Sequence, residues 1–241
     1  MSLKRLVNAL LAPLHAEVVR KEGAKEKPWD HTFKEGVKAT RQSGEDPNEA
    51  VRAAWGDPDW LRYYEPLVKE GDVVCEVGPG AGRWTQPILD RVSKIYLVDY
   101  SAYVCQLWRE KKDSRIEVVQ CANARMPTIP DASVDFFMSL DVFVHLELED
   151  FYGYMQEAWR VLKPGGKAVI DYMSIQNDYT VQYFKDELDK SGIYSGNETE
   201  RLAFRFHDTA TLQRLAEDLG FQFESEIDTW PTHAFCTLTK L

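Results

Sequence analysis

From Gly71 onward, short runs of β-branched and aromatic residues alternate with amphipathic segments of helical length. We expect strands near residues 73–77, 94–98, 116–120, 134–139 and 167–172. We expect helices between them, near residues 85–91, 103–110 and 150–162. Strands that alternate with helices in this way are typical of a parallel sheet with helices on both faces. The alternation therefore predicts a doubly wound α/β domain.

The pattern changes after residue 173. A polar, tyrosine-containing insertion at 174–206 interrupts the alternation, and Asp208 then caps an expected helix that ends at Gly220. Two β-like runs follow, at 221–227 and 234–239. Their short link favours an antiparallel hairpin. We therefore expect a mostly parallel, seven-stranded sheet with an antiparallel C-terminal hairpin.

The N-terminal residues 1–69 differ in character from the rest of the chain. Leucines recur at helical spacing within residues 3–18, and residues 21–44 are polar and charged with little periodicity. Asp-Pro pairs at residues 46–47 and 57–58 each predict the start of a short helix. We interpret residues 1–69 as helices and a lid, and residues 70–241 as one domain with the insertion.

Charge and cysteine spacing exclude several classes of protein. The 241 residues include 39 acidic and 29 basic ones, a net charge of −10, which disfavours a partner with a phosphate backbone. No apolar run is long enough to span a membrane, so we expect no membrane partner. Cys75, Cys105, Cys121 and Cys236 show neither zinc-site nor disulfide-scaffold spacing. These features predict a cytoplasmic protein without a metal site.

A glycine-rich segment, VVCEVGPGAGRWT, follows the first expected strand directly. A glycine turn between a strand and a helix lets a ligand approach the backbone. A dinucleotide-binding turn would place its third glycine at position 83, where this chain has Arg83. Pro79 also removes a backbone donor from the turn. The turn therefore suits a ligand that has no pyrophosphate.

Asp99 ends the second expected strand, 21 positions after Gly78. A carboxylate at this place can accept both hydroxyls of a ribose, in a nicotinamide or an adenosine cofactor. The motifs that follow are YLVDYS, CANARMP, VDFFMSLDVFVHL and RVLKPGGKAVI. In this order, over roughly residues 70–172, they resemble the class I S-adenosylmethionine-dependent methyltransferases, especially the small-molecule methyltransferases of the ubiquinone-biosynthesis-like type.

The resemblance implies a Rossmann-like fold with S-adenosylmethionine as cofactor and S-adenosylhomocysteine as product. It places the methionine half beside the glycine turn, the ribose at Asp99, and the adenine near Tyr100 and the 123–124 segment. The implied cofactor-binding residues are Glu76, Gly78, Pro79, Gly80, Gly82, Arg83, Asp99, Tyr100, Asn123, Ala124, Ser139 and Leu140. The chain departs from the family at Asn123, where an acid is more common.

Methyl transfer from a sulfonium is a direct displacement that depends mostly on alignment in a pocket poor in water. A general base is needed when the acceptor arrives protonated, and His145, just after the fourth expected strand, is the candidate. Its alternative is a packing or capping role. The expected substrate-binding residues are Trp29, His31, Tyr64, Asp141, Tyr172, Arg205 and His207.

The acceptor class follows from absent motifs. The tetrapeptide expected of enzymes that methylate exocyclic amines of nucleic acids is replaced by SLDV, and no Pro-Cys pair offers a nucleophile for cytosine. We expect a small-molecule acceptor such as a sugar, an amino sugar or a phenol. The sequence does not choose among oxygen, nitrogen and carbon, although His145 as a base favours oxygen. A protein or RNA acceptor, a catalytically idle binding protein and a nicotinamide oxidoreductase are the alternatives; the sequence predicts no oligomeric state.

Overall fold

The structure is a computed structural model that describes residues 59–121, 123–191, 204–227 and 232–241. The chain divides into two compact units, one of residues 60–184 and 205–241 and the other of residues 1–59 and 185–204. The first unit contains the whole sheet. The predicted lid and the N-terminal helices up to residue 58, with Trp29 and His31, lie outside the described residues, so the predicted division at residue 69 stays a prediction.

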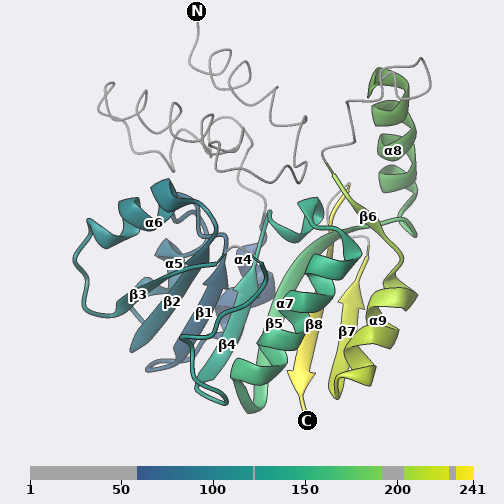
Figure 1. Ribbon diagram of the computed structural model, residues 1–241. Coiled ribbons are helices and arrows are strands. Elements are labelled where there is room, and N and C mark those ends of the chain that lie inside the picture. Colours follow the sequence, from purple (N-terminus) through teal and green to yellow (C-terminus); the bar gives the residue numbers. More distant parts are fainter. Residues whose placement is uncertain (1–58, 122, 192–203, 228–231) are drawn as a thin grey trace, which may run out of the picture. The chain divides into compact units, whose positions relative to one another are not determined.

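One sheet forms the centre of the first unit (Figure 1). The strand order along it is β3-β2-β1-β4-β5-β8-β7. The first five strands pair in parallel, whereas β8 pairs antiparallel with β5 and β7. The strands are β1 (Val73–Val77), β2 (Lys94–Asp99), β3 (Ile116–Gln120), β4 (Val134–Ser139), β5 (Leu162–Ser174), β7 (Phe221–Glu226) and β8 (Ala234–Lys240). The mostly parallel sheet and its C-terminal hairpin are confirmed.

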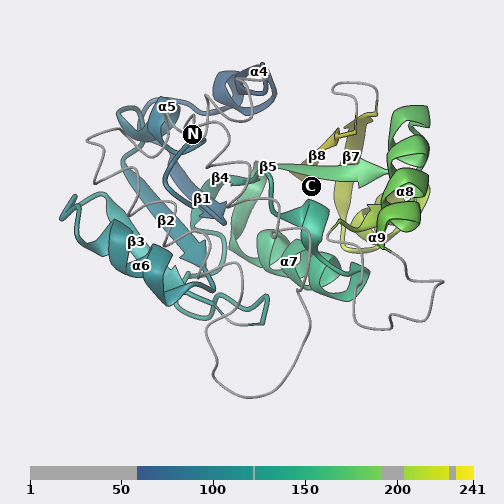
Figure 2. The ribbon, with the colours of Figure 1, turned by 90° about the horizontal axis from the view of Figure 1, so that it is seen from above.

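Helices lie on both faces of this sheet. Figure 2 shows α4 and α5 on one side of it and α7 on the other. The helices are α4 (Leu61–Tyr64), α5 (Gln86–Leu89), α6 (Ala102–Arg109), α7 (Leu148–Val161), α8 (Asp178–Ser191) and α9 (Thr209–Asp218), with 3-10 turns η2 (Glu65–Leu67) and η3 (Phe143–His145). None of the helices in the described ranges is long and apolar enough to cross a membrane.

Two segments differ from the prediction. The interval 174–206, expected to be a polar insertion, contains the helix α8 (Asp178–Ser191). At its end begins the two-residue strand β6 (Phe206–His207), which pairs with β5 and adds an eighth strand. The side chain of Asn177 accepts hydrogen bonds from the backbone nitrogens of Tyr179 and Thr180, so α8 begins at a typical amide cap. Strand β5 also begins at Leu162, five residues before the predicted start.

The order of the strands decides where a ligand can bind. Strand β1 lies between β2 and β4, so the chain leaves it in one direction along the sheet and later returns on the other side. In sheets of this kind, ligands bind beyond the carboxyl ends of the strands at this switch point. Because β8 runs antiparallel to β5, its first residues lie at the same edge. Residues after β1, β2, β4 and β5, and those before β8, are therefore brought together.

Candidate active site

The turn after β1 uses backbone conformations that favour glycine. Gly78, Gly80 and Gly82 have φ angles of 75°, 50° and 100°. A Cβ on Gly78 would overlap the side chain of Val142, which follows β4. A Cβ on Gly82 would press on the Trp108 ring of α6. The sequence therefore needs glycine here both for conformation and for close packing.

Neighbouring side chains hold this turn in place. Trp108 Nε1 donates a hydrogen bond of 2.9 Å to the carbonyl of Gly80. The hydroxyl of Tyr64 donates one of 2.9 Å to the carbonyl of Trp84, just after the turn. Tyr64 is fully buried, so the structure places it in the core instead of the acceptor space expected from the sequence. A turn held at both ends is preorganised for a ligand.

Glu76, near the end of β1, is a buried carboxyl group with 1% of its surface exposed. It accepts a hydrogen bond of 2.6 Å from the hydroxyl of Thr85. Burial raises the pKa of Glu76 to about 8; the hydrogen bond from Thr85 opposes this shift and the charge of Asp99 adds to it. A cationic group held beside Glu76 would favour its charged form.

Asp99, at the end of β2, is the second buried carboxylate at this edge, 6% exposed. Its Oδ1 accepts a hydrogen bond of 2.8 Å from the backbone nitrogen of Ser101. Ser101 in turn caps α6 by accepting a hydrogen bond from the backbone nitrogen of Val104. The carboxylate is thereby fixed beyond the end of β2, in the place expected for a group that binds a ribose.

Four of the remaining predicted cofactor residues fall into two groups. Ser139 donates its hydroxyl hydrogen bond to the carbonyl of Val77, which ties the end of β4 to the end of β1, and Leu140 is buried. After β3, Asn123 is exposed and Ala124 is buried at a positive φ of 52°. The predicted roles of these residues stay proposals.

An ion pair fixes the loop that follows Ala124. Glu157 on α7 accepts a hydrogen bond from the backbone nitrogen of Met126 and pairs with Arg160 at 2.8 Å. Arg160 also donates to the carbonyls of Met126 and Ile129. The pair therefore holds the loop on the side of the sheet edge where the adenine is expected.

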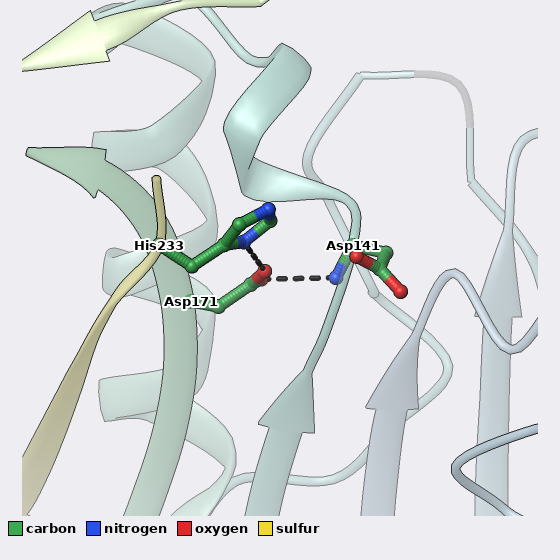
Figure 3. A group of neighbouring side chains, drawn as sticks. All are labelled: Asp141, Asp171 and His233. Atoms are coloured by element: carbon green, nitrogen blue, oxygen red, sulfur yellow. Dashed lines mark hydrogen bonds and ion pairs between the residues drawn. The ribbon is translucent and has the colours of Figure 1, made fainter. Parts of the chain in front are cut away.

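Three further side chains meet at the same edge: Asp141, Asp171 and His233 (Figure 3). Asp171 is fully buried near the end of β5, Asp141 lies two residues after β4, and His233 directly precedes β8. His233 Nδ1 lies 2.9 Å from Asp171 Oδ2, and the backbone nitrogen of Asp141 donates to Asp171 Oδ1 at 3.0 Å. Asp141 has a φ of 62°, a conformation that aspartate tolerates better than most residues.

This cluster adjoins the glycine turn. Trp84 Nε1 donates to Asp141 Oδ2 at 3.3 Å, and the guanidinium of Arg83 lies 3.9 Å from the same oxygen. The Arg83 guanidinium also stacks 4.4 Å above the Trp84 ring. The predicted cofactor residue Arg83 and the predicted substrate residue Asp141 are thus neighbours.

Most of the other predicted substrate residues lie elsewhere. Tyr172 is fully buried and shares a hydrogen bond of 2.9 Å with Thr209, while His207 is 6% exposed and bonds to the carbonyl of Leu146. Arg205 pairs with Glu147 at 2.7 Å. Arg205, Glu147 and His207 line a hollow of about 230 Å³. The burial of Tyr172 argues against a substrate contact there, whereas the predicted roles of Arg205 and His207 stay predictions.

The predicted base His145 ends the turn η3 and is partly buried. Asp171 and His233 are not among the site residues expected from the sequence. An aspartate near the end of an otherwise apolar strand was the available signal for Asp171. His233 carried no local signal, because its partner is 62 residues away and meets it only when β8 pairs with β5.

A family model described as a methyltransferase domain matches residues 75–170, the interval from β1 to β5. A crystal structure of an S-adenosylmethionine-dependent methyltransferase from Archaeoglobus fulgidus has the same fold, with a TM-score of 0.58 at 16% identity over 85% of this chain and 99% of that one. The chain therefore contains a class I S-adenosylmethionine-dependent methyltransferase domain.

Two curated relatives match this methyltransferase over different shares of the chain. An uncharacterised methyltransferase of Geobacillus sp. (strain WCH70) is 24% identical over 201 residues, 81% of this chain and 82% of that protein. A demethylmenaquinone methyltransferase of Tropheryma whipplei (strain Twist) is 27% identical over 132 residues, 54% of each chain. This chain therefore spans about half the length of the second relative.

The residues at the sheet edge fit the cofactor of such a methyltransferase. S-adenosylmethionine supplies an activated methyl group on a cationic sulfur. Glu76 is a buried carboxyl group whose hydrogen-bond partner is the neutral hydroxyl of Thr85, so its site favours a cationic ligand. Asp99 presents a fixed carboxylate one strand away. The glycine turn between them admits close approach of a ligand to the backbone.

Proposed function

We propose that this methyltransferase transfers the methyl group to a hydroxyl of a small-molecule acceptor, by direct displacement in a pocket closed against water. The observation that carries the proposal is the cluster of Asp141, Asp171 and His233. This cluster adjoins the glycine turn, because Trp84 at the end of the turn donates a hydrogen bond to Asp141. A hydroxyl loses a proton when it is methylated, and this cluster offers groups that can accept one.

The surroundings of the cluster favour an acceptor with an apolar or aromatic body. Trp60 lies against His233, with ring centroids 4.7 Å apart, and stacks on Trp84 at 5.2 Å. Phe235 packs edge-on against Trp60. Aromatic walls with a few convergent polar groups are typical of small-molecule sites. A phenol therefore suits this site better than a sugar does.

The net charge and one sequence relative also support a small-molecule acceptor. The net charge of −10 opposes binding to a nucleic-acid backbone. The relative from Tropheryma whipplei is named for an acceptor, demethylmenaquinone, that is a small molecule. A protein acceptor is the second candidate, and a regulatory protein that binds the cofactor without turnover is the third.

In this proposal the predicted cofactor residues keep their roles. Glu76 and the glycine turn hold the methionine half, Asp99 holds the ribose, and the Asn123 segment flanks the adenine. We keep the division expected from the sequence, with residues 70–241 as the catalytic domain and residues 1–69 as N-terminal helices and a lid.

An acceptor screen tests the proposal. The full chain is incubated with S-adenosylmethionine labelled on the methyl group and with separate sets of phenols, sugars, amino sugars, amines and unmodified proteins. We expect label in a phenol or another hydroxyl compound, and mass spectrometry of the product to place the methyl group on oxygen. Transfer only to protein would favour the second candidate. Binding of S-adenosylhomocysteine without transfer to any acceptor would favour the third.

A further inference from the structure

The pairing of β5 with β8 places His233 in hydrogen-bond contact with the buried carboxylate of Asp171. Asp171 pairs with Phe235 in the sheet, and His233 is two residues before Phe235 on the antiparallel strand. The side chain of Asp171 is fully buried, whereas that of His233 keeps 12% of its surface exposed. The histidine therefore lies between a buried anion and the edge of the sheet where ligands bind.

Hydrogen bonds fix which nitrogen of His233 carries the proton. A carboxylate oxygen can only accept, so His233 Nδ1–H donates to Asp171 Oδ2 at 2.9 Å. The other oxygen, Oδ1, accepts from the backbone nitrogen of Asp141, which keeps the carboxylate from rotating. The neutral ring then has its lone pair on Nε2, which points away from Asp171 (Figure 3).

The same contacts disfavour a metal ion in this cluster. Both oxygens of Asp171 already accept hydrogen bonds from N–H groups. Asp141 Oδ2 accepts a hydrogen bond from Trp84 and has the Arg83 cation at 3.9 Å. A divalent cation would have to displace these donors and approach the positive charge of Arg83. The arrangement is that of an oriented histidine.

Trp60 adds an observation that points to a ligand beside His233. Its ring is 4% exposed and packs against the imidazole, yet its Nε1 has no hydrogen-bond partner among the residues that the structure describes. A buried donor without an acceptor costs about 1–3 kcal/mol. An oxygen of an acceptor molecule held at this place would satisfy it.

We propose that His233, oriented by Asp171, is the general base that removes the proton from the acceptor hydroxyl. The proposal rests on the proposed transfer to oxygen. The O–H bond breaks and its proton goes to His233 Nε2; the oxygen forms the new bond to the methyl group, and the methyl–sulfur bond breaks with its electron pair going to sulfur. Asp171 is a positioning residue that stabilises the imidazolium formed.

The charges around His233 suit this role. Burial lowers the pKa of His233, but the hydrogen bond to Asp171 and the charges of Asp171 and Asp141 outweigh it, so the pKa lies above its usual value of 6.5. The Arg83 guanidinium lies 3.9 Å from Asp141 in the same cluster, and Trp60, directly before α4, adds an uncharged ring. A histidine of this kind is protonated, and inactive as a base, below its raised pKa.

His145 is the competing base. It ends η3 after β4, and its backbone nitrogen donates to the carbonyl of Val142. His233 is favoured because the buried carboxylate of Asp171 fixes both the orientation of its ring and its tautomer. A general base needs its accepting nitrogen held toward the proton that it removes.

The test compares four variants of the full chain on the acceptor that the screen identifies: His233→Gln, Asp171→Asn, His145→Ala and the control Glu117→Gln. Glu117 of β3 pairs with Lys94 of β2, and both side chains are partly exposed. Its change from acid to amide matches that of Asp171→Asn. We expect kcat to fall about 100-fold or more in His233→Gln and about 10-fold or more in Asp171→Asn, with no change in Glu117→Gln. In the wild type, kcat/KM should rise with pH through the pKa of His233, and Asp171→Asn should move this rise to lower pH.

Binding and metal controls separate the possible failures. Unchanged affinity for S-adenosylhomocysteine in His233→Gln and Asp171→Asn shows that the variants fold and that the cofactor site is intact. The inference is overturned if His145→Ala loses the rise with pH while His233→Gln keeps it. It is also overturned if EDTA abolishes the wild-type rate and Mg²⁺ restores it. Wild-type protein without transfer to oxygen in any acceptor would overturn the proposed function, and this inference with it.

Discussion

The hydroxyl of Thr85 donates a hydrogen bond of 2.6 Å to Glu76, the buried carboxyl group at the carboxyl end of β1. Thr85 directly precedes α5, so this bond joins the strand to the helix across the glycine turn. The bond leaves Glu76 with a neutral partner in a buried place, which is why its pKa is raised to about 8.

Glu76→Gln should change how stability depends on pH. The folded protein binds the Glu76 proton up to about pH 8, whereas the unfolded chain releases it near the ordinary value of 4.5. The free energy of unfolding therefore falls as pH rises across this interval in the wild type, and the glutamine variant lacks this contribution. Urea unfolding at several pH values measures the difference. Equal slopes in the two proteins would show that Glu76 is not buried as described.

Gly78→Ala should disrupt the turn and weaken cofactor binding. The new methyl group would overlap Val142 and would also force alanine into a positive φ of 75°. We expect a loss of about 2 kcal/mol in the free energy of unfolding and at least a 10-fold weaker affinity for S-adenosylhomocysteine. Calorimetric titration and urea unfolding measure the two effects.

Gly71→Ala is the matched control for this variant. Gly71 has a similar φ of 82°, but a Cβ there would meet nothing within 4 Å. It should lose about 1 kcal/mol from backbone strain alone and keep its affinity for the product. Equal effects of the two substitutions on affinity would contradict the role of close packing at Gly78.

Arg160→Met should destabilise the loop after β3. The substitution removes the cation closest to the largely buried Glu157. It also removes the donor that Arg160 provides to the loop carbonyls of Met126 and Ile129. Because Arg160 is itself 27% exposed, we expect a loss of about 2 kcal/mol, less than for a fully buried pair. Lys94→Met, which breaks a more exposed pair, should cost less than about 1 kcal/mol. An equal loss in the two variants, measured by urea unfolding, would contradict the account.

The parallel part of the fold was predictable because its signals are local. Strands β1, β3 and β4 have the bounds expected from buried β-branched runs that end in turns. Helix α9 begins after Asp208, whose side chain accepts a hydrogen bond from the Thr211 nitrogen as a cap should. The start of β5 was missed because its Pro164-Gly165-Gly166 segment resembles the end of a helix, yet the strand passes through it.

The missed helix α8 and the missed histidine have different causes. Val181, Phe184 and Leu188 recur at helical spacing within α8, but the many charged residues around them obscured the pattern. His233 could not be found from periodicity or spacing. Its significance depends on a strand pairing that joins positions 62 residues apart, which is a property of the tertiary structure.

The most direct test of the central claim is equilibrium binding of S-adenosylhomocysteine and of NADH to the wild type and to Asp99→Asn, measured by calorimetric titration. We expect the wild type to bind S-adenosylhomocysteine and not NADH. Asp99→Asn should bind S-adenosylhomocysteine at least about 10-fold more weakly, because the amide offers one uncharged acceptor oxygen to the ribose hydroxyls where the carboxylate offers two charged ones. Binding of NADH without S-adenosylhomocysteine, or an unchanged affinity in Asp99→Asn, would contradict the account of the cofactor site.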